Sequence, residues 1–105
     1  MLAQAMPTGT SAAAGYTNKN HSGITSIVVC NNSGAAVTYS IYVDQGGSTY
    51  ATSNALFYQV SIDAKSTDLL EFAGNGLTLD HPSDTIGVQS SVGSAVTFSF
   101  FGTRE

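Results

Sequence analysis

Charged residues and cysteine are scarce in this sequence of 105 residues. Lys and Arg number three and Asp and Glu seven, so that charged residues make up 10% of the chain and the formal net charge is −4. An ordinary soluble domain carries about 25% charged residues. A chain without a basic cluster cannot neutralise several phosphates, which argues against nucleic acid and against an anionic membrane surface as partners. The single cysteine, Cys30, cannot form an intrachain disulfide, and this indicates synthesis in a reducing cytoplasm.

Long apolar runs and helical periodicity are also missing. No apolar run approaches the roughly 18 residues that cross a bilayer, so we expect no membrane-spanning segment. Residues 1–7 lack the basic region and apolar stretch of a secretory signal, and Sec export is not indicated. No window places apolar residues at i, i+3 and i+4, which excludes amphipathic helices from the expected fold.

Uncharged side chains supply the polarity instead. The chain has 14 Ser, 12 Thr, 6 Asn and 4 Gln beside 11 Gly, and 42% of its residues are hydrophobic. A surface made of hydroxyls and amides can be buried against another protein without desolvating many ions. We therefore expect a protein that assembles with its own copies or with close neighbours.

From residue 24 onward, apolar and polar residues alternate with the period of two that is typical of β-strands. Residues 24–30 form an apolar, β-branched run, which predicts a strand covered on both faces. Residues 37–43, 56–62 and 96–100 alternate more strictly, and shorter strands are expected near 68–72, 77–79 and 86–88. Turn residues separate these segments at intervals of about 8–12 residues, which predicts an all-β antiparallel sandwich of seven to eight short strands, a jelly roll being one version of it.

The predicted core consists of the apolar residues that these strands would turn inward. They are Ile27, Val29, Val37, Tyr39, Ile41, Leu56, Tyr58, Val60, Ile62, Leu70, Ile86, Val88, Val96, Phe98 and Phe100. The sandwich domain is accordingly predicted to span residues 24–105.

Residues 1–23 differ from the rest of the chain and are predicted to form an N-terminal arm. Small residues fill positions 1–14 without strand or helix periodicity, and residues 16–23 are rich in turn formers. An arm that extends over a neighbouring copy and a frayed terminus both fit this composition. If the segment is an arm, deletion of residues 1–14 is expected to leave the sandwich folded but to weaken particle binding or oligomerisation.

Side chains that could carry out chemistry are isolated from one another. His21 and His81 are the only imidazoles, whereas zinc sites combine several His or Cys at short spacing. Asp80 and Asp84 flank His81, but two carboxylates fall short of the six to eight oxygens that calcium takes. Cys30 has no Lys or Arg within ten residues, which indicates a buried structural thiol. We predict neither an enzyme nor a metal or cofactor site.

Several aromatic residues are candidates for an interface. Tyr42, Tyr50, Phe57 and Phe101 fall on or near faces opposite the predicted core, and Tyr16 lies in the predicted arm. Exposed aromatic rings anchor protein interfaces, and they also stack on sugar rings. A third interpretation is plain packing beneath a loop on the second face of a sheet.

The order of several segments resembles a group of small virion proteins of tailed bacteriophages. The segments are Leu2-Ala3-Gln4-Ala5-Met6-Pro7 with Tyr16-Thr17, Ile27-Val28-Val29-Cys30-Asn31, Val37-Thr38-Tyr39-Ser40-Ile41, Ala55-Leu56-Phe57-Tyr58 with Ile62-Asp63-Ala64, Gly76-Leu77-Thr78-Leu79, Asp84-Thr85-Ile86-Gly87-Val88-Gln89-Ser90-Ser91 and Val96-Thr97-Phe98-Ser99-Phe100-Phe101-Gly102. The similarity extends over nearly the whole chain. Similar proteins carry a Val-Pro pair directly after the Tyr-Thr, where this chain has Asn18-Lys19-Asn20.

The resemblance implies a non-enzymatic β-sandwich that is built in many copies into a virion after synthesis in the host cytoplasm. The expected role is a capsid decoration (cement) protein, whose partners are the major capsid protein or other virion proteins and further copies of itself. A neck, collar or tail-fibre component is the alternative position in the particle. A carbohydrate-binding module that recognises host glycans is the alternative function.

Overall fold

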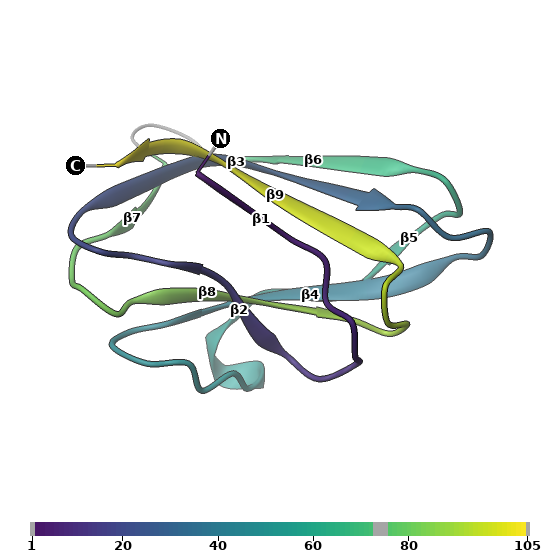
Figure 1. Cartoon of the computed structure of the whole chain (residues 1–105), viewed down its shortest axis with the longest axis horizontal. Helices are drawn as coiled ribbons and strands as arrows, with labels where there is room; N and C mark the ends of the chain where they lie inside the picture. The colour runs from purple at the N-terminus through teal and green to yellow at the C-terminus, as the bar shows by residue number, and fades with distance from the viewer. Residues whose placement is uncertain (1, 73–75, 105) are drawn as a thin grey trace.

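The computed structural model describes residues 2–72 and 76–104 and shows two antiparallel β-sheets packed face to face (Figure 1). This confirms the predicted all-β sandwich. The strands are β1 (Ala3–Ala5), β2 (Ala13–Thr17), β3 (Ser22–Asn31), β4 (Val37–Asp44), β5 (Ala55–Ile62), β6 (Thr67–Glu71), β7 (Leu77–Leu79), β8 (Thr85–Ser90) and β9 (Val96–Arg104), and one short 3-10 helix, η1 (Thr52–Asn54), precedes β5.

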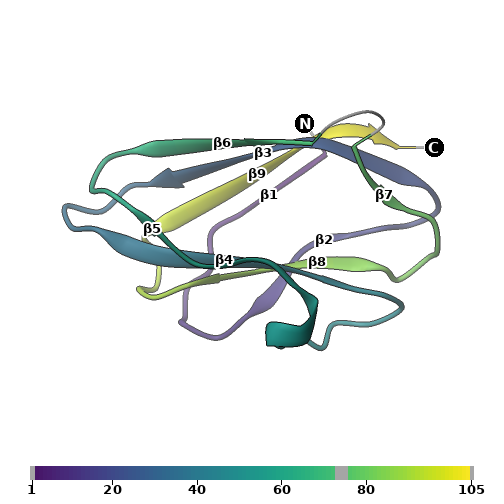
Figure 2. The same ribbon diagram turned by 180° about the vertical axis from the view of Figure 1, so that it is seen from behind.

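The strands divide between two sheets, which we name sheet A and sheet B. Sheet A has the order β1-β9-β3-β6, with β7 also paired to β3, and sheet B has the order β2-β8-β4-β5. The view from behind shows the same two layers, with the loop that contains η1 lying on the outer side of sheet B (Figure 2). Every pairing is antiparallel, as a chain without crossover helices requires.

The N-terminal segment belongs to the sandwich, so the predicted division into an arm (1–23) and a separate domain (24–105) is wrong. Strand β1 pairs with β9 in sheet A, and β2 pairs with β8 in sheet B. Ala3 lies opposite Phe100 and Ala5 opposite Phe98. Small side chains fit beside these large rings. They carry too little apolar surface, however, for the sequence to show the alternation of apolar and polar residues that identifies a strand. The segment between residues 5 and 13 passes from one layer to the other (Figure 1).

The core lies between the sheets and follows the prediction in most positions. The fully buried side chains include Ile27, Val29, Phe98 and Phe100 from sheet A and Tyr39, Ile41, Ile86 and Val88 from sheet B. Tyr39 and Phe98 meet edge to face with ring centroids 6.0 Å apart, which is a favoured aromatic geometry. Tyr16, Ile24, Leu79 and Ala95 also belong to the core, although the sequence did not indicate them.

Leu56 and Tyr58 are exposed, contrary to the prediction that they belong to the core. Tyr39 pairs with Val60 and Ile41 with Phe57, so that β5 has one residue more than β4 between these pairs. Such a β-bulge reverses the alternation of side chains. Phe57 therefore turns toward the core in place of Tyr58, while Val60 and Ile62 keep their predicted side.

Strand β3 also contains an irregularity, and it is not covered on both faces as predicted, because no described segment packs on the outer side of sheet A. Its register against β9 shifts between Ile24 and Ser26, so that Ile24 and Ile27 both point into the core. Beyond the shift, Val28 and Cys30 point outward and are only partly covered. Cys30 is therefore half-exposed, not the buried structural thiol that was predicted.

Candidate functional site

The outer face of sheet A is left open by the described parts of the fold. We call it the sheet A face and define it by the outward side chains of four strands, Gln4, Ser26, Val28, Cys30, Thr67, Leu69, Glu71, Thr97, Ser99 and Phe101. No described segment lies over these strands (Figure 1). The face forms one broad, continuous surface because the four strands are adjacent in the sheet.

Neutral side chains form regular rows across this face. Val28 lies between Leu69 on β6 and Ser99 on β9, and Cys30 lies between Thr67 and Thr97. Leu69 is 59% exposed, the largest value among the exposed large hydrophobic residues. Burial of such a side chain against a partner stabilises a complex by about 1.5–3 kcal/mol.

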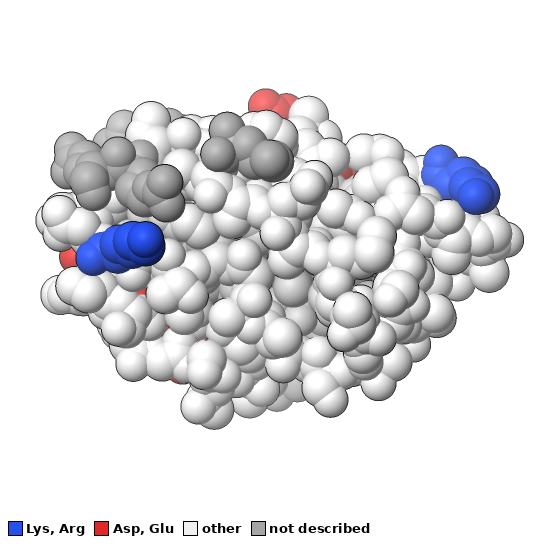
Figure 3. Space-filling model, viewed as in Figure 1, with Lys and Arg blue, Asp and Glu red and all other residues white. Residues whose placement is uncertain are grey.

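Charge is nearly absent from the same surface. Glu71, which lies beside Ser26, is the one charged member of the sheet A face. Figure 3 views the molecule from the side, with sheet A uppermost, and charged side chains are few on that side as well. Docking of the sheet A face therefore requires the desolvation of few ions.

A loop covers one part of the outer face of sheet B. Residues 45–54 connect β4 to β5, and within them Tyr50 stacks against Tyr42 with ring centroids 5.7 Å apart. The Tyr50 hydroxyl lies 2.6 Å from the Thr85 hydroxyl, and the Tyr42 hydroxyl donates to Gln89 Oε1 at 2.5 Å. Tyr42 is consequently only 4% exposed.

The structure separates the five aromatic residues that were predicted to form an interface. Tyr16 is a core residue whose hydroxyl meets that of Ser22, and Tyr42 lies beneath the loop, so neither ring is presented to a partner. Phe57 packs against Phe72 in the space between the sheets. Phe101 lies on the sheet A face and Tyr50 lies in the covering loop, both partly exposed.

Burial also affects the ionisation of two tyrosines. Burial, with the Asp68 carboxylate as acceptor of its hydroxyl at 3.0 Å, raises the pKa of Tyr39 far above its ordinary value. Burial raises the pKa of Tyr50 as well, while the hydrogen bond to Thr85 acts in the opposite direction. Both side chains are therefore neutral hydrogen-bonding groups at physiological pH.

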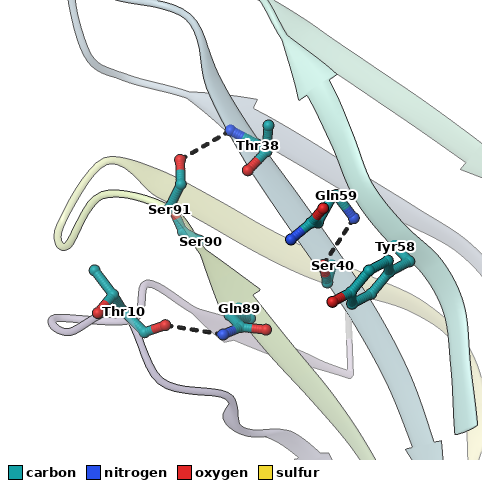
Figure 4. A pocket seen from close by; sticks show the side chains of 8 residues that line it. All are labelled: Thr10, Thr38, Ser40, Tyr58, Gln59, Gln89, Ser90 and Ser91. Atoms are coloured by element: carbon teal, nitrogen blue, oxygen red, sulfur yellow. Dashed lines mark hydrogen bonds between the residues drawn. The ribbon is translucent and has the colours of Figure 1, made fainter. Parts of the chain in front are cut away.

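The remaining part of the outer face of sheet B contains a small polar hollow of about 130 Å³. Figure 4 shows its lining side chains, which are Thr10, Thr38, Ser40, Tyr58, Gln59, Gln89, Ser90 and Ser91. None of them carries a charge. Sequence reasoning missed Tyr58 and Gln59 because the bulge that turns them outward leaves no signal in the alternation.

Two buried asparagines connect the loops at the ends of the sandwich. The Asn18 amide nitrogen lies within hydrogen-bond distance of the carbonyl oxygens of Asn20, Leu79 and His81. The Asn31 amide similarly meets the carbonyls of Ala35, Ile62 and Asp63. These contacts give both residues a structural role.

The acidic residues near His81 serve the structure in a similar way. The Asp84 carboxylate is buried and accepts the backbone N–H groups of Gly46 and His81. His21 Nδ1 lies 3.7 Å from Asp80 Oδ1 at the surface, where such a pair contributes little. Among residues 2–72 and 76–104, no three His, Cys, Asp or Glu side chains form a group that could hold a metal ion.

The same described ranges contain no helix long and apolar enough to traverse a bilayer. Comparison of the chain with protein-family models, with curated proteins and with solved structures finds no match.

Proposed function

We propose that this chain is a non-enzymatic structural protein of a bacteriophage virion, and that it acts as a capsid decoration protein that binds the major capsid protein in many copies. The observation that carries the proposal is the sheet A face, a continuous, neutral surface of hydroxyl and apolar side chains that nothing described in the fold covers. The order of sequence segments described above supplies the virion context.

The size of this face suits a standard protein contact. In Figure 1 the sheets are stacked along the intermediate axis, so that the sheet plane spans the 38 Å and 20 Å extents of the molecule. One partner in a standard interface contributes about 800 Å². A single sheet face therefore provides one contact of ordinary size.

Repetition makes a moderate contact sufficient for stable attachment. A decoration protein meets the same surface on every capsid subunit, and further contacts between neighbouring copies raise the effective affinity through avidity. Few ions need to be desolvated at each contact, which favours neutral over charged surfaces in such an assembly.

The copy number of the protein in purified virions tests the proposal. Quantitative mass spectrometry of particles whose genome encodes this chain is expected to give hundreds of copies per particle. Six or twelve copies would instead place the protein in a neck or tail ring and contradict decoration. Absence from washed particles would contradict a virion role altogether.

A further inference from the structure

The polar hollow on sheet B lies on the opposite side of the molecule from the sheet A face. Its floor comes from Ser40 on β4 and Gln89 on β8, and Tyr58 and Gln59 on β5 form one wall (Figure 4). Thr10 and Ser91 bound it on the other side. A ligand in the hollow could therefore be bound while sheet A is attached to a partner.

The floor is held in place by hydrogen bonds. Gln89 accepts the Tyr42 hydroxyl through Oε1 and donates from Nε2 to the carbonyl of Thr10 at 3.0 Å. Both ends of this amide are engaged, and the side chain is fixed. Preorganised polar groups of this kind lower the cost of binding a ligand.

Two hydroxyl groups in the hollow have an O–H that is still available to donate a hydrogen bond. Ser40 Oγ accepts the backbone N–H of Gln59 at 2.9 Å, and Ser91 Oγ accepts that of Thr38 at 3.0 Å. A serine hydroxyl accepts through its lone pairs and still has its own O–H. Within the described chain no hydrogen bond uses either O–H, although Ser40 is only 3% exposed.

The wall of the hollow owes its position to strained backbone. Gln59 has a φ of +51°, a conformation that residues other than glycine seldom adopt, and it lies in the bulge of β5. Strained residues and bulges recur at binding sites, where they direct a side chain. Here the bulge turns Tyr58 outward, 49% exposed, so that the ring leans over the hollow (Figure 4).

We propose that this hollow binds a single ring of a neutral saccharide. The C–H face of a sugar ring carries a weak positive potential and packs against the negative face of an aromatic ring such as Tyr58. Sugar hydroxyls, which donate and accept, match the Ser40 and Ser91 hydroxyls and the Gln59 amide. The lining offers no charge that would compensate a charged sugar, which predicts neutral over acidic or amino sugars.

This inference goes beyond the proposed function and does not depend on it. The small volume of the hollow, below the roughly 300–1,000 Å³ of sites for drug-sized molecules, indicates one ring and weak binding, with a Kd of about 1 mM. Strong attachment to a glycan-coated surface would require many copies of the protein to bind at the same time.

The test is a nuclear magnetic resonance titration of the whole chain. The probes are the methyl glycosides of glucose, galactose, mannose and N-acetylglucosamine, with glucuronic acid and glucosamine as charged comparisons. At least one neutral glycoside is expected to shift the backbone amides of Thr38, Gln59 and Ser91 and to saturate. Tyr58→Ala is expected to weaken that binding about tenfold, whereas Tyr58→Phe keeps the ring and most of the affinity.

Matched variants separate binding from folding. Leu56→Ala removes a similarly exposed side chain from the same strand and should leave the affinity unchanged. Gln59→Gly keeps the backbone conformation without steric cost and should weaken binding about threefold to tenfold through the lost amide. The proposal is overturned if no neutral glycoside shifts these amides, if the charged sugars bind equally well, or if Tyr58→Ala has no greater effect than Leu56→Ala. Binding of a virion protein to this hollow in the absence of any sugar binding would also overturn it.

Discussion

The ring of Tyr50 occupies the space that a side chain at position 87 would need. A Cβ built on Gly87 would lie 2.5 Å from Tyr50 Cε1, and the Tyr50 hydroxyl is held 2.6 Å from that of Thr85. The loop of residues 45–54 therefore closes on sheet B only because β8 has a glycine beneath the ring.

Gly87→Ala is expected to displace Tyr50 and to lower the free energy of unfolding by about 1–3 kcal/mol, because the added methyl group overpacks this contact. Urea denaturation measures the change. Gly34→Ala is the matched control, since a Cβ at Gly34 meets nothing within 4 Å. Equal effects of the two substitutions would show that the contact between Tyr50 and Gly87 is unimportant.

Asn18→Asp is expected to destabilise the fold at neutral pH by about 3–5 kcal/mol, because it places a buried carboxylate against the carbonyl oxygens of Leu79 and His81. Burial raises the pKa of the introduced carboxyl in the folded state. The penalty is therefore small below the unfolded pKa of about 4 and grows as the pH rises through that value. Urea denaturation at several pH values checks both statements, with the exposed Asn20→Asp as the control. A penalty that does not vary with pH would contradict this account.

The raised pKa values of two tyrosines predict that the fold loses stability at alkaline pH. Folding raises the pKa of Tyr39 and of Tyr50, so the stability that their neutral forms contribute is complete below the unfolded pKa of about 10 and is lost as the pH rises above it. The loss is expected to approach about 1.4 kcal/mol per pH unit for each tyrosine that stays protonated in the folded chain.

Tyr39→Phe tests this dependence. The variant is expected to lose about 1 kcal/mol at pH 7, because the hydrogen bond to Asp68 disappears, and to show a flatter decline above about pH 10. Denaturant unfolding across the alkaline range measures both effects. An unchanged alkaline slope would mean that Tyr39 ionises in the folded protein as it does in the unfolded chain.

Leu69→Glu is expected to weaken attachment to virion particles at least tenfold, because it places a charge on the sheet A face, where docking would desolvate it. The free energy of unfolding should change by less than about 0.5 kcal/mol, since Leu69 is exposed. Co-sedimentation with particles measures attachment, and analytical ultracentrifugation measures self-association. Val92→Glu makes the same change at an exposed apolar residue between β8 and β9. If the Leu69→Glu and Val92→Glu variants attach to particles equally well, the sheet A face is excluded as the docking surface.

Removal of residues 1–12 is expected to destabilise the sandwich by about 2–3 kcal/mol, because it strips β1 from β9 and uncovers one side of Phe98 and Phe100. This replaces the expectation from sequence that residues 1–14 are dispensable for folding. Thermal unfolding of the truncated chain measures the loss, and an unchanged transition would restore the interpretation of this segment as an arm.

The sequence predicted those parts of the fold in which alternation is regular. Phe98 and Phe100, or Tyr39 and Ile41, point inward because nothing interrupts their strands. Prediction failed at the bulges of β3 and β5, where one added residue makes the alternation of side chains on the two sides of the bulge differ. A bulge depends on pairing with a distant strand, and a single sequence does not display that pairing.

The candidate sites were less predictable than the fold for the same reason. Tyr42 has the alternation of an outward residue, but its exposure depends on a loop that folds back from residues 45–54. Leu70 was correctly predicted to face inward, but that Leu69 lies on an open surface beside Val28 depends on the pairing of β6 with β3. Low charge, by contrast, is a property of composition, and it anticipated the neutral sheet A face.

The pairing of β1 with β9 also governs the order of events during synthesis. Gln4 and Ser99 are hydrogen-bonded across 95 positions of the chain, so β1 has no partner in sheet A until β9 has emerged from the ribosome. The ladder between β3 and β9 waits for the same moment. Contacts of such long range slow folding. Sheet A is therefore completed only after β9 has been synthesised, and the surface proposed to hold the protein on a particle does not exist before then.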